Sequence, residues 1–242
     1  MRAGRRTSAR GDSGFSLIEL MVAMGLTLIV MVIAAKFLAQ SFNVRAREDR
    51  RSDAIADVQR AINIMGREIA NSGYRLPADL KYTPPGGTAT AVPVNGLLPA
   101  YSDGDSIAFV ANLNAQAGAV GTTNNYVNET DEAVLFTLST NAAANPAQSF
   151  LSRMDMSTGN VMVLANRIDS LTITYFDRDP ATGALSALPA NSAPTANTTK
   201  VRIAVTVTLP AVGTSGKEGY QKLFRTQLQT EVALRNANLS GY

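Results

Sequence analysis

The chain has no cysteine and no histidine among its 242 residues. Without cysteine it has no disulfide, no thiol nucleophile and no Cys-ligated metal site. Without histidine it lacks the commonest general base and the commonest metal ligand of proteins. Hydrolysis by paired carboxylates is the one catalytic strategy that we weigh against this composition.

The positive charge is concentrated at the start of the chain. The formal net charge is +3, from 22 basic and 19 acidic side chains. Residues 1–14 hold four arginines and one aspartate, and removing these leaves 18 side chains of each sign. A neutral remainder offers phosphates no electrostatic attraction, so we expect no nucleic-acid partner. The four arginines are interpreted as cytoplasmic orientation charges.

A long apolar run follows directly on the basic segment. From residue 15 to residue 35 the chain carries one ionisable side chain, Glu19. A helix over this run is about 31 Å long, enough to cross a bilayer core of about 30 Å. A carboxylate at that depth is costly, so Glu19 is expected to have a function beyond anchoring.

The residues around Glu19 form a recognisable motif, Gly14-Phe15-Ser16-Leu17-Ile18-Glu19. It resembles the class III signal of type IV prepilins. The resemblance implies cleavage by a prepilin peptidase between Gly14 and Phe15 and N-methylation of Phe15. It also implies that Glu19 pairs with the N-terminal amine of a neighbouring subunit during assembly. Since the site precedes the apolar run, cleavage would leave the anchor on the protein, unlike cleavage of a secretory signal peptide.

The helical pattern continues beyond the apolar run. Apolar residues spaced by three and four form a stripe that we expect to pack on the globular domain: Ile55, Val58, Ile62, Met65 and Ile69. A coiled-coil seam is the competing use, but two heptads are too few to demand one. Asn71-Ser72-Gly73, with Pro77 beyond, predicts the end of the helix.

The rest of the chain is predicted to be rich in β-strands. Alternating apolar residues and turn signals predict strands over residues 106–110, 133–139, 148–156, 161–165, 167–176, 201–209 and 223–234. Loops are expected over residues 76–105, 111–130, 140–147 and 180–199. The predicted fold class is α+β, with a long N-terminal helix packed on an antiparallel sheet.

Four blocks of this part of the chain support a narrower resemblance. They are NSGYRLP (71–77), RIDSLTITYFD (167–177), KVRIAVTVTLPA (200–211) and FRTQLQTEVALRN (224–236). Their order resembles PilW-type minor pilins and the related J-type minor pseudopilins of type II secretion. The implied organisation has a leader at 1–14, a transmembrane and assembly half-helix at 15–36, a periplasmic amphipathic half-helix at 37–72, and a periplasmic β-rich domain at 73–242.

The close acidic pairs are expected to be solvated turn carboxylates. They are Asp103/Asp105, Asp131/Glu132 and Asp177/Asp179. Asp103-Gly104-Asp105-Ser106 lacks the later ligands and the bidentate glutamate of a calcium loop. We therefore expect no catalytic residue, no metal site and no cofactor, with calcium the one ion left open because related pseudopilins bind it.

Four tyrosines lie in segments that are expected to be loops: Tyr74, Tyr82, Tyr101 and Tyr126. They suit adhesion or subunit contact, and ordinary surface positions explain them equally well.

The first functional hypothesis is a structural one: a minor pilin in the priming or tip complex of a type IV pilus, supporting twitching and adhesion. Its implied partners are prepilin peptidase, other minor pilins, the major pilin, a tip adhesin and inner-membrane lipid. The implied location is the inner membrane, with one span and a periplasmic domain, and then the pilus tip or cell surface. The alternatives are a minor pseudopilin of a type II secretion system and, less favoured, a membrane-anchored hydrolase or binding protein.

Overall fold

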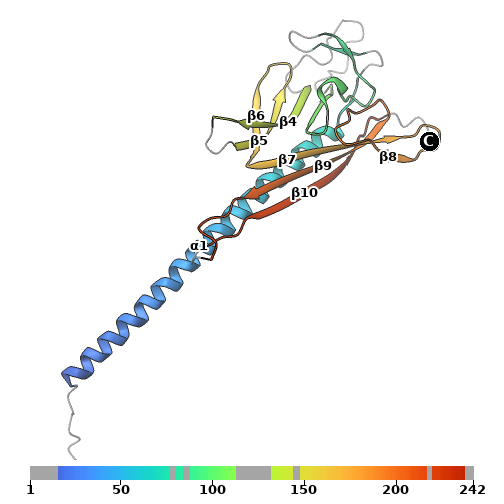
Figure 1. Cartoon of the computed structure of the whole chain (residues 1–242). Coiled ribbons are helices and arrows are strands. Elements are labelled where there is room, and N and C mark those ends of the chain that lie inside the picture. Colours follow the sequence, from blue (N-terminus) through green and yellow to red (C-terminus); the bar gives the residue numbers. More distant parts are fainter. Residues whose placement is uncertain are drawn as a thin grey trace, which may run out of the picture. The chain divides into compact units, whose positions relative to one another are not determined.

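The structure is a computed structural model that describes residues 16–76, 80–83, 88–112, 132–143, 148–216 and 220–237. The chain forms two compact units, residues 1–49 and residues 50–242. Helix α1, Leu17–Ala70, begins in the first unit and ends in the second (Figure 1). Gly14 and Phe15, the expected processing residues, lie outside the described residues.

Helix α1 ends where the sequence predicts. The amides of Asn71 and Ser72 donate to the carbonyls of Glu68 and Ile69, both at 3.0 Å, which tightens the last turn. Gly73 then takes a positive φ of 75°, and its amide turns away from the helix to donate to Val110 O at 2.9 Å. The predicted helix end is confirmed.

The first four-stranded sheet contains β3 (Ser106–Val110), β4 (Ala133–Asn141), β5 (Gln148–Asp155) and β6 (Val161–Asn166), antiparallel in that order. The predicted hairpin of β5 and β6 is confirmed, and residues 156–160 connect its two strands, with the turn at 156–158. Strand β4 continues to Asn141, two residues into a segment expected to be a loop. Every strand predicted for this sheet is present, although burial does not alternate along all of them: β3 is buried over Ile107–Val110, whereas β6 begins with three exposed residues.

The second four-stranded sheet has the order β10-β9-β7-β8 and is also antiparallel. It contains β7 (Ile168–Arg178), β8 (Leu185–Ala187), β9 (Thr198–Leu209) and β10 (Phe224–Ala233). Strand β8 was not expected, because residues 180–199 were predicted as a loop and all three of its side chains are exposed. Without a buried face, β8 has no alternating pattern that a sequence could show.

A third, small element lies in the segment 76–105, which was expected to be a loop. It holds β1 (Lys81–Tyr82) paired with β2 (Thr90–Ala91), followed by the 3₁₀ helix η1 (Pro99–Tyr101). Its apolar residues form a second core with β3 and β4, in which Tyr82 is only 1% exposed. Tyr82 is therefore a core residue, and its expected surface position is wrong.

The main core joins α1 to both four-stranded sheets. Val58, Ile62, Met65 and Ile69 of the helical stripe are buried in it, whereas Ile55 is half-buried. The same core contains Ile107 and Phe136 of the first sheet, and Ile203 and Val205 of the second. The α+β class, with a long helix packed against antiparallel strands, is confirmed. The division of the strands between two sheets is a feature that only the structure shows.

Candidate processing and assembly segment

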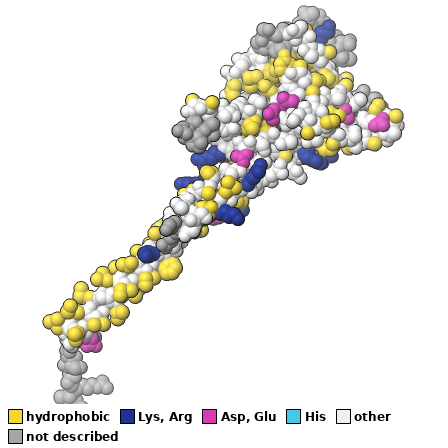
Figure 2. All heavy atoms as spheres, in the orientation of Figure 1, with side chains coloured by type: hydrophobic (Ala, Val, Ile, Leu, Met, Phe, Trp, Pro, Cys, Tyr) yellow, Lys and Arg dark blue, Asp and Glu magenta, His cyan; other side chains and the backbone are white. Residues whose placement is uncertain are grey.

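The first half of α1 is apolar on every side. From Leu17 to Ile33 its large apolar side chains are all exposed, and hydrophobic atoms cover the visible face of this segment (Figure 2). In the part of the chain that the structure describes, α1 is the one helix long and apolar enough to cross a membrane. A helix that is hydrophobic all round is suited to lipid or to the interior of an assembly.

Thr27, a polar residue within this segment, is compatible with an apolar environment. The hydroxyl of Thr27 donates to the carbonyl of Ala23 at 2.7 Å, so that it is satisfied inside the helix. Gly25 has no atom within 4 Å of where a Cβ would lie. Nothing in the described chain therefore requires a glycine at residue 25.

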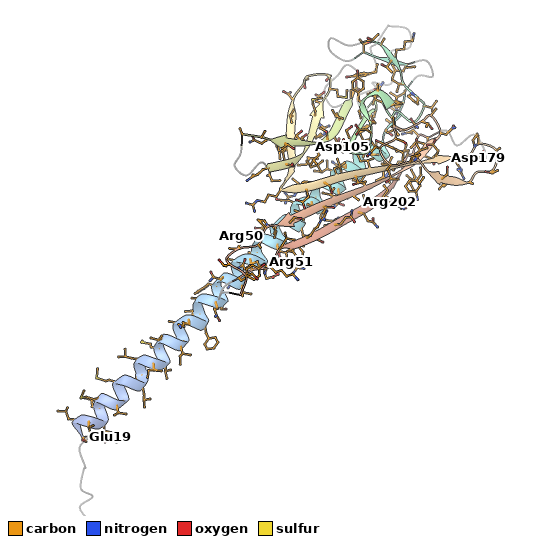
Figure 3. The ribbon with its side chains drawn as sticks, viewed as in Figure 1. Glu19, Arg50, Arg51, Asp105, Asp179 and Arg202 are labelled. Carbon is orange, nitrogen blue, oxygen red and sulfur yellow. The ribbon has the colours of Figure 1, made fainter. Side chains whose placement is uncertain are left out.

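Glu19 lies in the first turn of α1, at the N-terminal end of the helix (Figure 3). The side chain is exposed, and no ion pair to it is present among the described residues. The positive end of the helix dipole favours a carboxylate in the first turn. In lipid this partial charge is too weak to replace a counter-ion, so the position calls for a cation from outside the described chain.

The second half of α1 is fixed by polar contacts as well as by its apolar stripe. Arg153 Nε of β5 donates to both carboxylate oxygens of Glu68, at 2.9 and 3.2 Å. These side chains are only 12% and 23% exposed. At the start of the second unit, the Arg51 guanidinium lies 4.0 Å from the centre of the Phe224 ring of β10. Neither pairing has a local signal in the sequence, because the partners come from segments distant in the chain.

Asp103 and Asp179 lie in turn-like segments, as predicted, and their carboxylates accept hydrogen bonds that hold these segments. Asp103 Oδ1 accepts hydrogen bonds from the amides of Asp105 and Ser106, at 3.0 and 2.8 Å. Partial burial of Asp103 opposes its ionisation, but these hydrogen bonds outweigh it and hold the pKa below its ordinary value. The side-chain hydrogen bond to Asp103 raises the pKa of Asp105. Asp179 similarly accepts from Ala181 N at 2.8 Å.

Glu132 corrects the expectation of solvated carboxylates, since it is 2% exposed. Its neighbour Asp131 lies outside the described residues, as does Tyr126. No group of three or more His, Cys, Asp or Glu side chains that could hold a metal ion occurs within the described ranges. The expectation of solvated turn carboxylates is also wrong for Asp177, which lies in β7 and accepts hydrogen bonds from two threonine hydroxyls, each at 2.6 Å.

Comparison with known proteins adds a family to this geometry. The prokaryotic N-terminal methylation motif matches residues 9–35, which include Gly14, Phe15 and Glu19. No curated protein matches the chain. Among solved structures, the type IV-like pilin TTHA1219 from Thermus thermophilus aligns over 76% of this chain and 97% of its own, at 11% identity and a TM-score of 0.36. At these values the alignment adds no support to any statement about fold or function.

The match to the methylation motif includes both the predicted processing site and part of helix α1. It covers the end of the basic segment from residue 9, the expected cleavage site and the apolar part of α1 up to residue 35. Such a motif implies processing by prepilin peptidase and assembly with other pilins, and together with the apolar helix it suits a single-pass protein anchored in the inner membrane. It indicates a structural subunit rather than an enzyme. Over these residues, the chain is similar to type IV pilin-like proteins.

Proposed function

We propose that this chain is a minor pilin of a type IV pilus and acts in the priming or tip complex that starts assembly. In this proposal, cleavage after Gly14 releases the leader, Phe15 becomes the methylated N-terminus, and residues 15–36 hold the protein in the inner membrane. Residues 37–72 and the β-rich domain, 73–242, lie in the periplasm before the subunit is drawn into the pilus. Other minor pilins, the major pilin and a tip adhesin are its proposed partners.

One observation carries the proposal. A single carboxylate, Glu19, lies in the first turn of a helix whose next sixteen residues are uncharged. Cleavage between Gly14 and Phe15 would create a cationic amine in the same segment. A carboxylate and an amine from two adjacent subunits neutralise each other in lipid, which gives Glu19 the counter-ion that the described chain lacks.

The experiment that tests this proposal is intact-mass measurement and N-terminal sequencing of the protein from native membranes. A chain beginning at N-methylated Phe15 is the expected result. A chain that begins at Met1, or beyond residue 35, would contradict the proposal, because either result leaves no amine beside Glu19 within the apolar segment.

The same motif also suits a minor pseudopilin of a type II secretion system, and deletion of the gene distinguishes the two machines. Loss of twitching motility with normal exoprotein secretion is expected for a minor pilin. Loss of secretion with normal twitching would assign the chain to the secretion system instead. Re-expression of the intact chain is the control that the phenotype belongs to this protein.

A further inference from the structure

The two outer strands of the first sheet differ in how their edges are covered. The edge of β3 is closed by residues 96–98, because Val110 N donates to Gly96 O at 2.8 Å and Leu98 N donates to Ala108 O at 2.9 Å. Beyond β6, the sheet has no further strand among the described residues (Figure 1). Within the described ranges, strand β6 is therefore the open edge of this sheet.

The backbone groups on that edge can be assigned from the register. Asp155 N donates to Asn160 O at 2.9 Å, so the polar backbone groups of Asn160 face β5. These groups alternate in direction along an antiparallel strand. Those of Met162 consequently face β5, while the N–H and C=O groups of Val161 and Val163 point outward from the sheet.

The side chains along β6 leave this edge unprotected. Val161, Met162 and Val163 are 57%, 59% and 49% exposed, and β6 contains no charged residue and no proline. Natural proteins usually block an open edge with lysine, proline or an inward-pointing charge. Three consecutive exposed apolar residues on an unblocked edge indicate a strand that is covered in the assembled state.

The charged side chains near β6 favour an uncharged strand as the partner of its open edge. Met162 lies directly opposite Arg153 of β5, which is the charged side chain nearest to it in the register. Arg153 is already paired with Glu68 at 2.9 Å. A strand added beside β6 therefore meets neither an unpaired cation nor an unpaired anion on this strand pair.

We propose that β6 pairs antiparallel with β6 of a second copy of this chain, about a two-fold axis at Met162. In this register Val161 lies opposite the second copy's Val163, so the outward backbone groups of each strand meet those of the other and form four hydrogen bonds. The valines also form two β-branched cross-strand pairs, which are favourable in sheets. Because the strand is uncharged, the two copies do not repel one another.

The structure also limits the extent of this seam. The pairing of β6 with β5 skips Leu164, a bulge that ends the regular edge after Val163. So short a seam falls well below the roughly 1,200 Å² typical of stable interfaces, and the dimer is expected to be weak in dilute solution. It is expected to form where copies are held together, as on a membrane surface.

The chain contains no cysteine, so one introduced thiol reports the register directly. The two copies of Met162 form a non-hydrogen-bonded pair with Cα atoms about 4.5 Å apart, within the range of a disulfide. The experiment uses full-length Met162→Cys in membrane vesicles with copper–phenanthroline and dissolved oxygen. Each disulfide forms from two thiols, whose two protons and two electrons pass to oxygen.

Two variants provide the controls for chance collision. Val161→Cys places its thiols at diagonal positions about 7–8 Å apart, too far for a relaxed disulfide. Leu185→Cys lies on another outer strand, β8, and its side chain is similarly exposed at 53%. Met162→Cys is expected to give about tenfold more covalent dimer than either control, because only its thiols meet in disulfide geometry.

A second substitution tests whether the strand edge itself makes the contact. Val163→Lys, added to Met162→Cys, is expected to abolish the covalent dimer, whereas Leu185→Lys leaves it unchanged. Unaltered thermal unfolding of the reduced variants checks that the fold is kept. Equal cross-linking of all three cysteine variants, no cross-linking, or a cross-link to a different protein identified by mass spectrometry would overturn the proposal. The start of the mature chain has no bearing on this result.

Discussion

Among single residues, two buried tyrosines differ in whether the hydroxyl has a hydrogen-bond partner. Tyr175 and Tyr82 are both about 1% exposed. The hydroxyl of Tyr175 donates to Ser106 O at 3.0 Å, a bond between the two four-stranded sheets. The hydroxyl of Tyr82 is buried with no partner in the described part of the chain. Removing these two hydroxyls is therefore expected to have opposite consequences.

Tyr82→Phe is expected to leave the free energy of unfolding unchanged or to raise it by about 1 kcal/mol, because an unpaired buried hydroxyl is costly. Burial raises the pKa of Tyr82 to about 12. The folded state therefore keeps this proton while the unfolded state loses it near pH 10, and stability falls between about pH 10 and 12. Urea unfolding at neutral and alkaline pH measures both effects, and Tyr82→Phe is expected to reduce the alkaline loss.

Tyr175→Phe is the matched control for that variant, since it loses a hydrogen bond and is expected to cost about 1 kcal/mol. Equal changes in the free energy of unfolding at neutral pH would contradict the distinction between the paired hydroxyl of Tyr175 and the unpaired hydroxyl of Tyr82.

The Arg153–Glu68 pair is the polar link between α1 and the first sheet. Glu68→Ala is expected to lower the free energy of unfolding by about 1–3 kcal/mol, because it removes the carboxylate to which the largely buried Arg153 guanidinium donates. Chemical unfolding followed by circular dichroism measures the change.

Glu231→Ala is the control for Glu68→Ala, since it also removes a carboxylate paired with arginine. Glu231 bonds Arg202 and Lys200 on an exposed sheet face (Arg202 is labelled in Figure 3), where solvent screens the charges. A much smaller effect is expected there. Equal losses from the two variants would show that burial does not govern the strength of these pairs.

At the scale of elements, the end of α1 depends on one residue that lacks a side chain. Gly73 has a φ of +75°, and a Cβ there would lie 2.4 Å from Val94 O. Its amide also bonds β3, so the same residue ends the helix and fixes the next segment against the first sheet. An alanine would have to distort either the helix end or that contact.

Gly73→Ala is accordingly expected to cost several kcal/mol, the sum of left-handed strain of about 1–2 kcal/mol and a clash with backbone. Gly159→Ala provides a matched control, because Gly159 has a φ of +74° and no atom within 4 Å of its missing Cβ. Gly159→Ala is therefore expected to lose only the free energy of the left-handed backbone strain. Thermal unfolding of both variants measures the difference, and similar losses would show that the close approach to Val94 is unimportant.

At the scale of the whole molecule, α1 uses two kinds of surface in succession. Its first half is apolar all round with one carboxylate, and its second half buries one stripe in the core of the β-rich domain. The first surface needs lipid or other subunits, whereas the second is satisfied within the chain. Assembly is therefore expected to depend on the first half and folding of the domain on the second.

Glu19→Ala and Glu19→Gln are each expected to lower the amount of this protein in sheared pili by about tenfold or more, because both remove the charge that pairs with the neighbouring amine. Quantitative immunoblots of pilus and membrane fractions measure incorporation. Asp53→Ala removes the same charge from an exposed site outside the apolar segment and is expected to be incorporated normally. Normal incorporation of the Glu19 variants would show that assembly does not depend on pairing of Glu19 with the amine of a neighbouring subunit.

The features that depend on neighbouring residues were predictable from the amino-acid sequence. Four of these features are local patterns: the motif at Gly14 to Glu19, the apolar run, the stripe from Ile55 to Ile69 and the helix end at Gly73. The strands with a buried face were predictable for the same reason, because alternation along a few residues reports burial of one side. Even the α+β class follows from one long helical period followed by strands.

The contacts between these elements were not predictable in this way, because they join segments far apart in the chain. The partners Arg153 and Glu68 are 85 residues apart, and the amide of Asn95 donates to the carbonyls of Thr195 and Thr198 across 100 and 103 residues. The burial of Tyr82, the open edge at β6 and the division of the strands into two sheets depend on the same long-range packing. No local pattern records such contacts, because each side chain is selected by neighbours that become adjacent only when the chain folds.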